Sequence, residues 1–210
     1  MSEIKTTDFS ELNTNKMDGF HQIKPEQGTT LDKAKSFVDG LFSHKSDSPD
    51  ALSSDEKIFK DDNGKVYRIG DRLEPNKTFD VNGYTYKTDR QGRVISTEGQ
   101  LRLRKPEYVR KMDSMETVGK GDQKENDERG HSIGHQFEGS GGMENLTAMS
   151  KELNHGDYSK MENKLADAIK AGDTVHLKVN PVYSRDSYRP TKYRVSYSID
   201  GHKTAVTFRN

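Results

Sequence analysis

The chain of 210 residues has no cysteine and no tryptophan, and only 29% of its residues are hydrophobic. The absence of cysteine excludes disulfides and thiolate metal sites, so the composition implies neither a reducing nor an oxidising compartment. No apolar run reaches the roughly 18 to 20 residues that cross a bilayer, and the N-terminal stretch lacks the apolar core of a secretory signal. We therefore expect a protein made in the cytoplasm, with no membrane insertion and no classical signal peptide.

An excess of charge of one sign is also absent, because 34 Lys and Arg balance 34 Asp and Glu. The balance argues against a uniformly basic nucleic-acid coat, but it conceals a gradient. Residues 1–62 hold 8 basic and 13 acidic side chains, whereas residues 163–210 hold 9 and 4. The gradient suits a C-terminal part that binds a polyanion. Two ordinary solvated surfaces of unequal charge are the alternative.

Composition divides the chain into two parts. Residues 1–62 are acidic and polar and predict a loosely ordered N-terminal segment, since they contain few residues that could form a core. Within them, residues 31–42 carry apolar side chains at helical intervals and predict one short helix. Residues 43–54 have the composition of a linker. Residues 63–210 are expected to form the folded domain.

Alternating apolar and polar residues predict several strands in this domain. An Asn82-Gly83 pair between two of them is typical of a β-hairpin, as is Asp200-Gly201 near the C-terminus. Residues 150–171 carry apolar side chains at helical spacing, with Gly172 as the stop and Asn154 or Asp157 as candidate caps. The predicted strands cover residues 65–69, 78–81, 84–88, 93–96, 174–179, 193–199 and 204–208. The fold class expected is α+β, with an antiparallel sheet and one principal helix.

A short run, Glu128-Arg129-Gly130-His131, contains residue types suited to phosphodiester hydrolysis. A histidine with an ordinary pKa near 6.5 can take a proton from water at neutral pH, so His131 is the candidate general base. Arg129 lies two residues earlier and would project from the same face of a strand, where its guanidinium could bind phosphate oxygens. Isolated Arg-Gly-His runs occur by chance in loops, so the prediction depends on the residues farther along the chain.

Downstream of this run lie candidate ligands for a divalent cation. The amide oxygen of Asn154 could enter a Mg²⁺ shell, and Glu162 could hold a metal-bound water. A helix cap for Asn154 and a solvated helix face for Glu162 are the alternatives. A zinc-protease motif is excluded in practice, because Ser132 occupies the place of the glutamate that should follow His131.

Together these segments resemble the DNA/RNA non-specific endonuclease family of ββα-metal nucleases. The resemblance rests on residues 127–163, including Arg129-Gly130-His131, Asn145-Leu146-Thr147, Leu153-Asn154-His155-Gly156 and Met161-Glu162-Asn163. It is strongest to the branch found at the C-termini of bacterial secreted nuclease toxins, including type VII secretion effectors. The one departure is Glu128, where the family has aspartate.

The resemblance implies a ββα-metal core, His131 as general base, Asn154 as the Mg²⁺ ligand, and catalytic roles for Arg129, Asn145 and Glu162. It also implies cleavage of DNA, with RNA as a further substrate, in Mg²⁺ or Mn²⁺, leaving a 5′-phosphate. We expect a secreted antibacterial toxin module that is active in the target-cell cytoplasm and neutralised by an immunity protein. A non-catalytic binding module on the same fold and an exported scavenging nuclease are the alternatives.

Basic residues near the C-terminus are candidates for the substrate groove, although a charged strand face is an equally good interpretation. They are Arg185, Arg189, Lys192 and Arg194.

Overall fold

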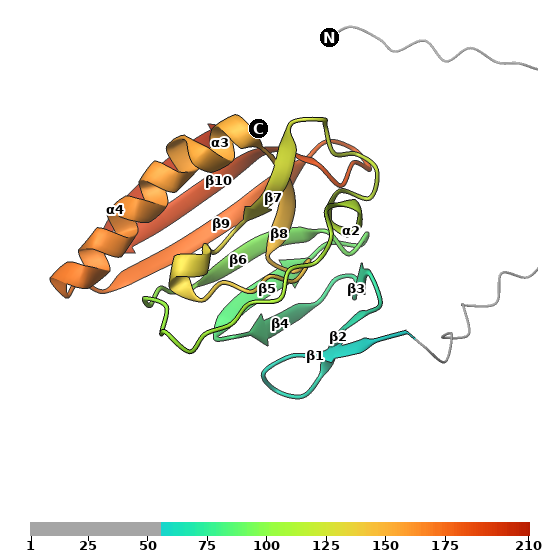
Figure 1. The fold of residues 1–210 in the computed structure, drawn as a ribbon, viewed down its shortest axis with the longest axis horizontal. Helices are drawn as coiled ribbons and strands as arrows, with labels where there is room; N and C mark the ends of the chain where they lie inside the picture. Colours follow the sequence, from blue (N-terminus) through green and yellow to red (C-terminus); the bar gives the residue numbers. More distant parts are fainter. Residues whose placement is uncertain (1–55) are drawn as a thin grey trace, which may run out of the picture. The chain divides into compact units, whose positions relative to one another are not determined.

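A computed structural model of the protein describes residues 56–210 (Figure 1). The predicted helix over residues 31–42 and the predicted linker over 43–54 lie outside the described residues. The predicted boundary between the N-terminal segment (1–62) and the folded domain (63–210) stays a prediction. The first described strand begins before it, at Ile58.

A six-stranded antiparallel sheet is the largest element, with the strand order β11-β10-β9-β6-β5-β4 (Figure 1). Its strands are β4 (Thr78–Val81), β5 (Tyr84–Thr88), β6 (Val94–Gln100), β9 (Val175–Tyr183), β10 (Pro190–Ile199) and β11 (His202–Arg209). Each lies within a few residues of a predicted strand, which confirms that alternation located them. The hairpin turns are also confirmed, because Asn82 and Gly83 both have positive φ, at 55° and 74°.

Two helices follow one another where a single helix was expected: α3 (Lys151–His155) and α4 (Asp157–Ala171). The break falls at Gly156, whose ψ of −113° is not helical and whose missing Cβ would lie 2.4 Å from the carbonyl oxygen of Glu152. The predicted caps were wrong, since the Ser150 side chain accepts from Leu153 N–H at the start of α3. The predicted stop is confirmed, because Gly172 adopts a left-handed conformation with φ of 100°.

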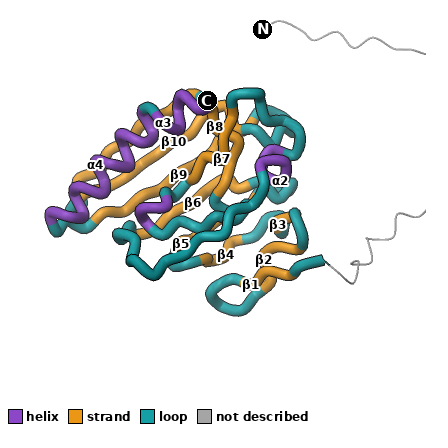
Figure 2. The backbone as a smooth tube through the Cα atoms, in the orientation of Figure 1, coloured by secondary structure: helices purple, strands orange, loops and turns teal. Residues whose placement is uncertain are grey.

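A two-stranded antiparallel sheet lies with α4 on one face of the large sheet (Figure 2). It pairs β7 (Asp127–His131) with β8 (Leu146–Ser150), placing His131 opposite Leu146. The buried ring of Tyr158 on α4 lies 6.1 Å from that of Tyr193 on β10, and its hydroxyl donates to the carbonyl of Ser132. Strands β7 and β8 with α4 form the two strands and helix expected of a ββα core, which confirms the predicted α+β fold.

A second small sheet packs at the other end of the large one. It contains β1 (Ile58–Lys60), β2 (Val66–Ile69) and β3 (Arg72–Leu73). Tyr67 stacks on Phe79 at 4.6 Å between ring centroids, and Phe79 stacks on Tyr86 at 5.7 Å, so aromatic contacts join the two sheets. The remaining elements are α2 (Met115–Gly119) and one 3₁₀ turn, η1 (His135–Phe137). No helix among residues 56–210 is long and apolar enough to span a membrane.

A buried ion pair ties β7 to the loop that precedes β10. Arg189 donates from Nε and Nη2 to the Asp127 carboxylate at 2.6 and 2.8 Å, and the two side chains are 9% and 1% exposed. Burial by itself would raise the pKa of Asp127, but hydrogen bonds from Arg189 and from the backbone of Lys124 outweigh it and lower the pKa. This pair therefore stabilises the fold most when Asp127 is ionised.

Asp127→Asn should lower the free energy of unfolding by about 3 kcal/mol at neutral pH, because it leaves a buried guanidinium without a counter-charge. The loss should shrink as the pH falls through the depressed pKa of Asp127, where the wild-type pair also disappears. Urea unfolding at several pH values measures both effects.

Asp167→Asn is the matched control, since Asp167 forms an exposed ion pair with Lys170 on α4. It should change stability by less than about 0.5 kcal/mol. Equal losses in the two variants would contradict a structural role for the buried pair.

Candidate active site

His131 ends β7 and is held in a mostly buried position. Its Nε2 is fully buried and has no hydrogen-bond partner among residues 56–210. Burial, followed by the positive charges of Arg110, His135 and Arg129, lowers its pKa to about 3. The imidazole is therefore neutral at physiological pH. A neutral imidazole is the form that accepts a proton, although a pKa this low makes it a weak base.

Glu162 projects from α4 toward the loop that follows β7. A Cβ at Gly134 would lie 2.4 Å from its Oε1, so only glycine leaves room for this carboxylate. Its Oε1 is buried without a partner in the described part of the chain. Burial raises the pKa of Glu162 to about 7, while the backbone amide of Gly134 and the charge of Arg110 act in the opposite direction. The carboxylate is thus held in place with one oxygen unsatisfied.

Arg110 is a site residue that the sequence analysis missed. Its Nη1 is buried without a partner within residues 56–210, and its charge acts on both His131 and Glu162. The neighbouring backbone fixes its place, because a Cβ at Gly141 would lie 2.0 Å from the carbonyl of Lys111 and 2.8 Å from Cγ of Arg110. The sequence around Arg110 has neither a helical or strand periodicity nor a known motif. Arg110 is therefore recognised as a site residue only from its contacts with distant elements of the fold.

Asn145 is completely buried and clamps the loop between β7 and β8. Its Oδ1 accepts from Ile133 N–H at 2.9 Å, and its Nδ2 donates to the carbonyls of Ile133 and Ser140, both at 2.8 Å. These bonds use both Nδ2 hydrogens and one of the two acceptor positions of Oδ1. These hydrogen bonds support a positioning role for Asn145, and the catalytic role that the family resemblance implied stays a prediction.

Asn154 and Glu128 form a second part of the site. Nδ2 of Asn154 donates to Oε2 of Glu128 at 3.0 Å, and Nε2 of His155 contacts the same oxygen at 2.6 Å. The Asn154 bond, outweighing a small opposing effect of burial, lowers the pKa of Glu128. Since the amide nitrogen is engaged, the amide oxygen of Asn154 is left for another ligand. Glu128 thus orients Asn154, although it departs from the family's aspartate.

Arg129 is exposed and lies between the part of the site that contains His131 and Glu162 and the part that contains Glu128 and Asn154. Its Nη1 donates to the carbonyl of Asp113 at 3.0 Å, and its charge contributes to the lowered pKa of His131. Together with Glu128 and Asn154 it lines a hollow of about 640 Å³. The predicted residues Arg129, His131, Asn154 and Glu162 therefore belong to one region, with Asn145 beneath it.

The predicted basic groove does not form beside His131. Arg189 is buried in its ion pair with Asp127. Lys192 and Arg194 alternate with buried Tyr193 on β10 and so face the opposite side of the large sheet from α4 and β7. Arg185 lies in the exposed loop between β9 and β10, where its carbonyl accepts from Arg93 at 2.7 Å. The sequence showed which residues were basic but not which side of the sheet they would occupy.

Residues 56–210 contain no cluster of three or more His, Cys, Asp or Glu side chains able to hold a metal ion, so a divalent cation would depend on other oxygen donors. The amide oxygen of Asn154 and the unpartnered Oε1 of Glu162 are the oxygen ligands that Mg²⁺ prefers. With so few protein ligands, affinity would depend on water and on the phosphate oxygens of a substrate.

Comparison with known proteins agrees with this geometry. Residues 75–201 match the family described as DNA/RNA non-specific endonuclease. The matched range contains every residue of the site, from Arg110 to Glu162. The chain belongs to this family.

Relatives in Staphylococcus aureus carry a name that concerns secretion. The chain is 32% identical over 128 residues to the type VII secretion system protein EssD of strain USA300, and equally to that of strain NCTC 8325. The aligned part covers 58% of this chain and 20% of each EssD. The chain thus aligns with about a fifth of the length of the curated relatives it matches.

Gly134→Ala should lower nuclease activity about 100-fold while leaving the fold intact, because the new methyl group displaces the Glu162 carboxylate by roughly 1 Å. The φ of Gly134 is −63°, so alanine introduces no backbone strain. Plasmid cleavage rates and thermal unfolding of the same preparation test both statements. Wild-type cleavage by a folded Gly134→Ala protein would show that the position of Glu162 does not matter.

Proposed function

We propose that this protein is a Mg²⁺-dependent endonuclease that cuts DNA, and also RNA, without sequence preference. The observation that carries the proposal is a pair of buried atoms, Nε2 of His131 and Oε1 of Glu162, that lack a partner among residues 56–210 and lie near the charge of Arg110. Buried polar atoms without partners are costly and uncommon in folded proteins, and they concentrate where a ligand completes the bonding.

His131 acts as the general base in this proposal. Its neutral imidazole takes a proton from a water molecule, and that water attacks the phosphorus in line with the bond to be broken. The attack breaks the bond between phosphorus and the 3′ oxygen. One fragment then ends in a 3′-hydroxyl, and the other carries a 5′-phosphate. Since the water supplies the nucleophile, the reaction needs no 2′-hydroxyl, and DNA and RNA are both chemically competent substrates.

Arg110 and Arg129 supply positive charge to the phosphoryl oxygens. Charge develops on these oxygens in the transition state, and guanidinium groups bind them bidentately. Arg110 is partly buried, so its attraction is less screened by water than that of the exposed Arg129.

Asn154 and Glu162 would hold Mg²⁺, the first directly and the second through a bound water. The cation, when bound, neutralises charge on the phosphate and on the leaving oxygen. Glu128 keeps the Asn154 side chain oriented toward this task through the hydrogen bond at 3.0 Å. Mn²⁺, which takes similar oxygen ligands, is expected to substitute.

Supercoiled plasmid should be cut to open-circular and linear forms in Mg²⁺, and EDTA should abolish the cutting. His131→Ala should lower the rate by at least about 100-fold, because general-base catalysis contributes that much or more. Gel quantification of plasmid forms over time is the measurement. Unchanged cleavage by a folded His131→Ala protein would remove His131 from the mechanism. Absence of cleavage in both Mg²⁺ and Mn²⁺ would favour a non-catalytic binding module.

We further propose that the nuclease is the toxin module of a secreted bacterial effector, acting in the cytoplasm of a target cell and neutralised by an immunity protein. The type VII secretion name of the Staphylococcus aureus relatives supports secretion by this route. A nuclease without sequence preference damages any cell that contains it unless it is inhibited. An exported nuclease that scavenges nucleic acid is the alternative role.

Expression of the chain alone in a bacterium should stop growth and fragment the chromosome, whereas His131→Ala should be tolerated at equal expression. Viable counts and chromosomal DNA on gels measure the effect. Normal growth and intact chromosomal DNA, with active enzyme recovered from the lysate, would contradict the toxin role and leave the scavenging role.

A further inference from the structure

The large sheet presents a second polar surface on the side away from α4, β7 and β8. On β9, β10 and β11 the outward positions alternate with the buried ones. We call the cationic part of this surface the basic face. Its cations are Lys178, Lys192, Arg194 and Lys203, and His176 lies beside them.

Positive charge on the basic face is largely uncompensated. None of the outward positions on these three strands is acidic. Glu98 on the neighbouring strand β6 pairs with Lys178 at 2.9 Å. Lys192, Arg194 and Lys203 form no ion pair within residues 56–210. The chain as a whole has no net charge, so this concentration of cations is a local property of the sheet.

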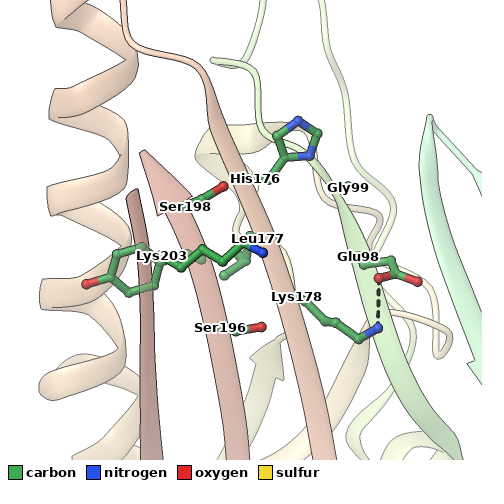
Figure 3. Close-up of a pocket in the computed structure, with 9 residues that line it drawn as sticks. Glu98, Gly99, His176, Leu177, Lys178, Ser196, Ser198 and Lys203 are labelled. Carbon is green, nitrogen blue, oxygen red and sulfur yellow. Dashed lines mark ion pairs between the residues drawn. The ribbon is translucent and has the colours of Figure 1, made fainter. Parts of the chain in front are cut away.

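Small side chains leave two hollows between these cations. The first, of about 450 Å³, is lined by His176, Lys178, Ser196, Ser198 and Lys203 (Figure 3). The second, of about 290 Å³, lies farther along β10 and is lined by Asn180, Arg194, Ser196, Ala205 and Thr207. Hydroxyl, amide and cationic groups together can donate to phosphate oxygens at either place.

We propose that the basic face binds the phosphate backbone of duplex DNA, as a contact separate from the active site. This proposal rests on the proposed function, since the DNA held here is the substrate cut elsewhere. Charge complementarity selects the occupant. A protein partner would need aromatic or large apolar anchors, and the outward positions of β9 to β11 offer no aromatic side chain and only Val182 and Ala205 as apolar ones.

The position of the basic face determines what it contributes. The sheet separates it from His131, so one short straight duplex cannot reach both. A long or supercoiled molecule can touch the basic face with one segment while another segment enters the active site. The first contact raises the effective concentration of scissile phosphates at the second. Long DNA should therefore bind more tightly than short duplexes.

The test measures binding of a long fluorescent duplex to the full chain in the His131→Ala background, so that cleavage does not enter the readout. Arg194→Gln with Lys203→Gln should weaken binding about 10-fold at moderate salt and make the plot of log K against log salt shallower by about 2, one phosphate contact for each cation. Lys160→Gln with Lys170→Gln on α4 removes the same charge and is the matched control. The control pair should keep the wild-type slope.

Cleavage of bis(p-nitrophenyl) phosphate by the Arg194→Gln, Lys203→Gln protein with His131 intact confirms that the variant is folded. A rate equal to wild type with weakened long-DNA binding supports the basic face. Wild-type affinity and salt slope in the variant would overturn it, as would an equal loss in the control pair. If the double variant fails to fold, Lys203→Gln alone on the exposed edge strand should still lower the slope by about 1. If no substrate is cut, the proposed function fails while the binding result stands.

Discussion

The hydrogen bonds of Asn145 are the constraint on which the site depends. Residues between β7 and β8 cross the protein interior with little regular structure, and their backbone groups must find partners there. The Asn145 amide satisfies three of them, on Ile133 and Ser140. With the loop held in this way, Gly134 lies against Glu162, and Gly141 lies against the segment that carries Arg110. A shorter or differently shaped side chain at position 145 would leave both contacts without support.

The arrangement places polar groups in the interior that the described part of the chain does not satisfy with hydrogen bonds. His131 and Glu162 each keep one buried atom without a partner within residues 56–210, and burial is the largest cause of both pKa shifts. Such groups reduce stability, so other interactions must offset them. The Asp127 and Arg189 ion pair is one of these, because it anchors the start of the strand that ends at His131. The free energy that this ion pair contributes to folding thus stabilises β7, although burial of His131 at the end of that strand is unfavourable.

Local sequence signals were sufficient for much of the fold. Alternating residues and the Asn82-Gly83 turn located the strands, because these depend on neighbours along the chain. The family motif singled out His131, Asn154 and Glu162, whose roles stay predictions. Sequence could not show that Arg189 would be buried or that Arg194 would face away from His131, since both depend on how distant strands pair. Arg110 was missed for the same reason, and Gly156 broke a helix that apolar spacing predicted as continuous.

Chemical rescue tests the central claim, that the His131 imidazole is the base, most directly. His131→Gly removes the ring and leaves space beside Arg110 and Glu162. Added imidazole should restore plasmid cleavage in a concentration-dependent, saturable manner, and should do nothing for a Glu162→Ala protein. Failure of imidazole to restore any cleavage to a folded His131→Gly protein that still binds DNA, or substantial cleavage by that protein without imidazole, would contradict the role of His131 as the base.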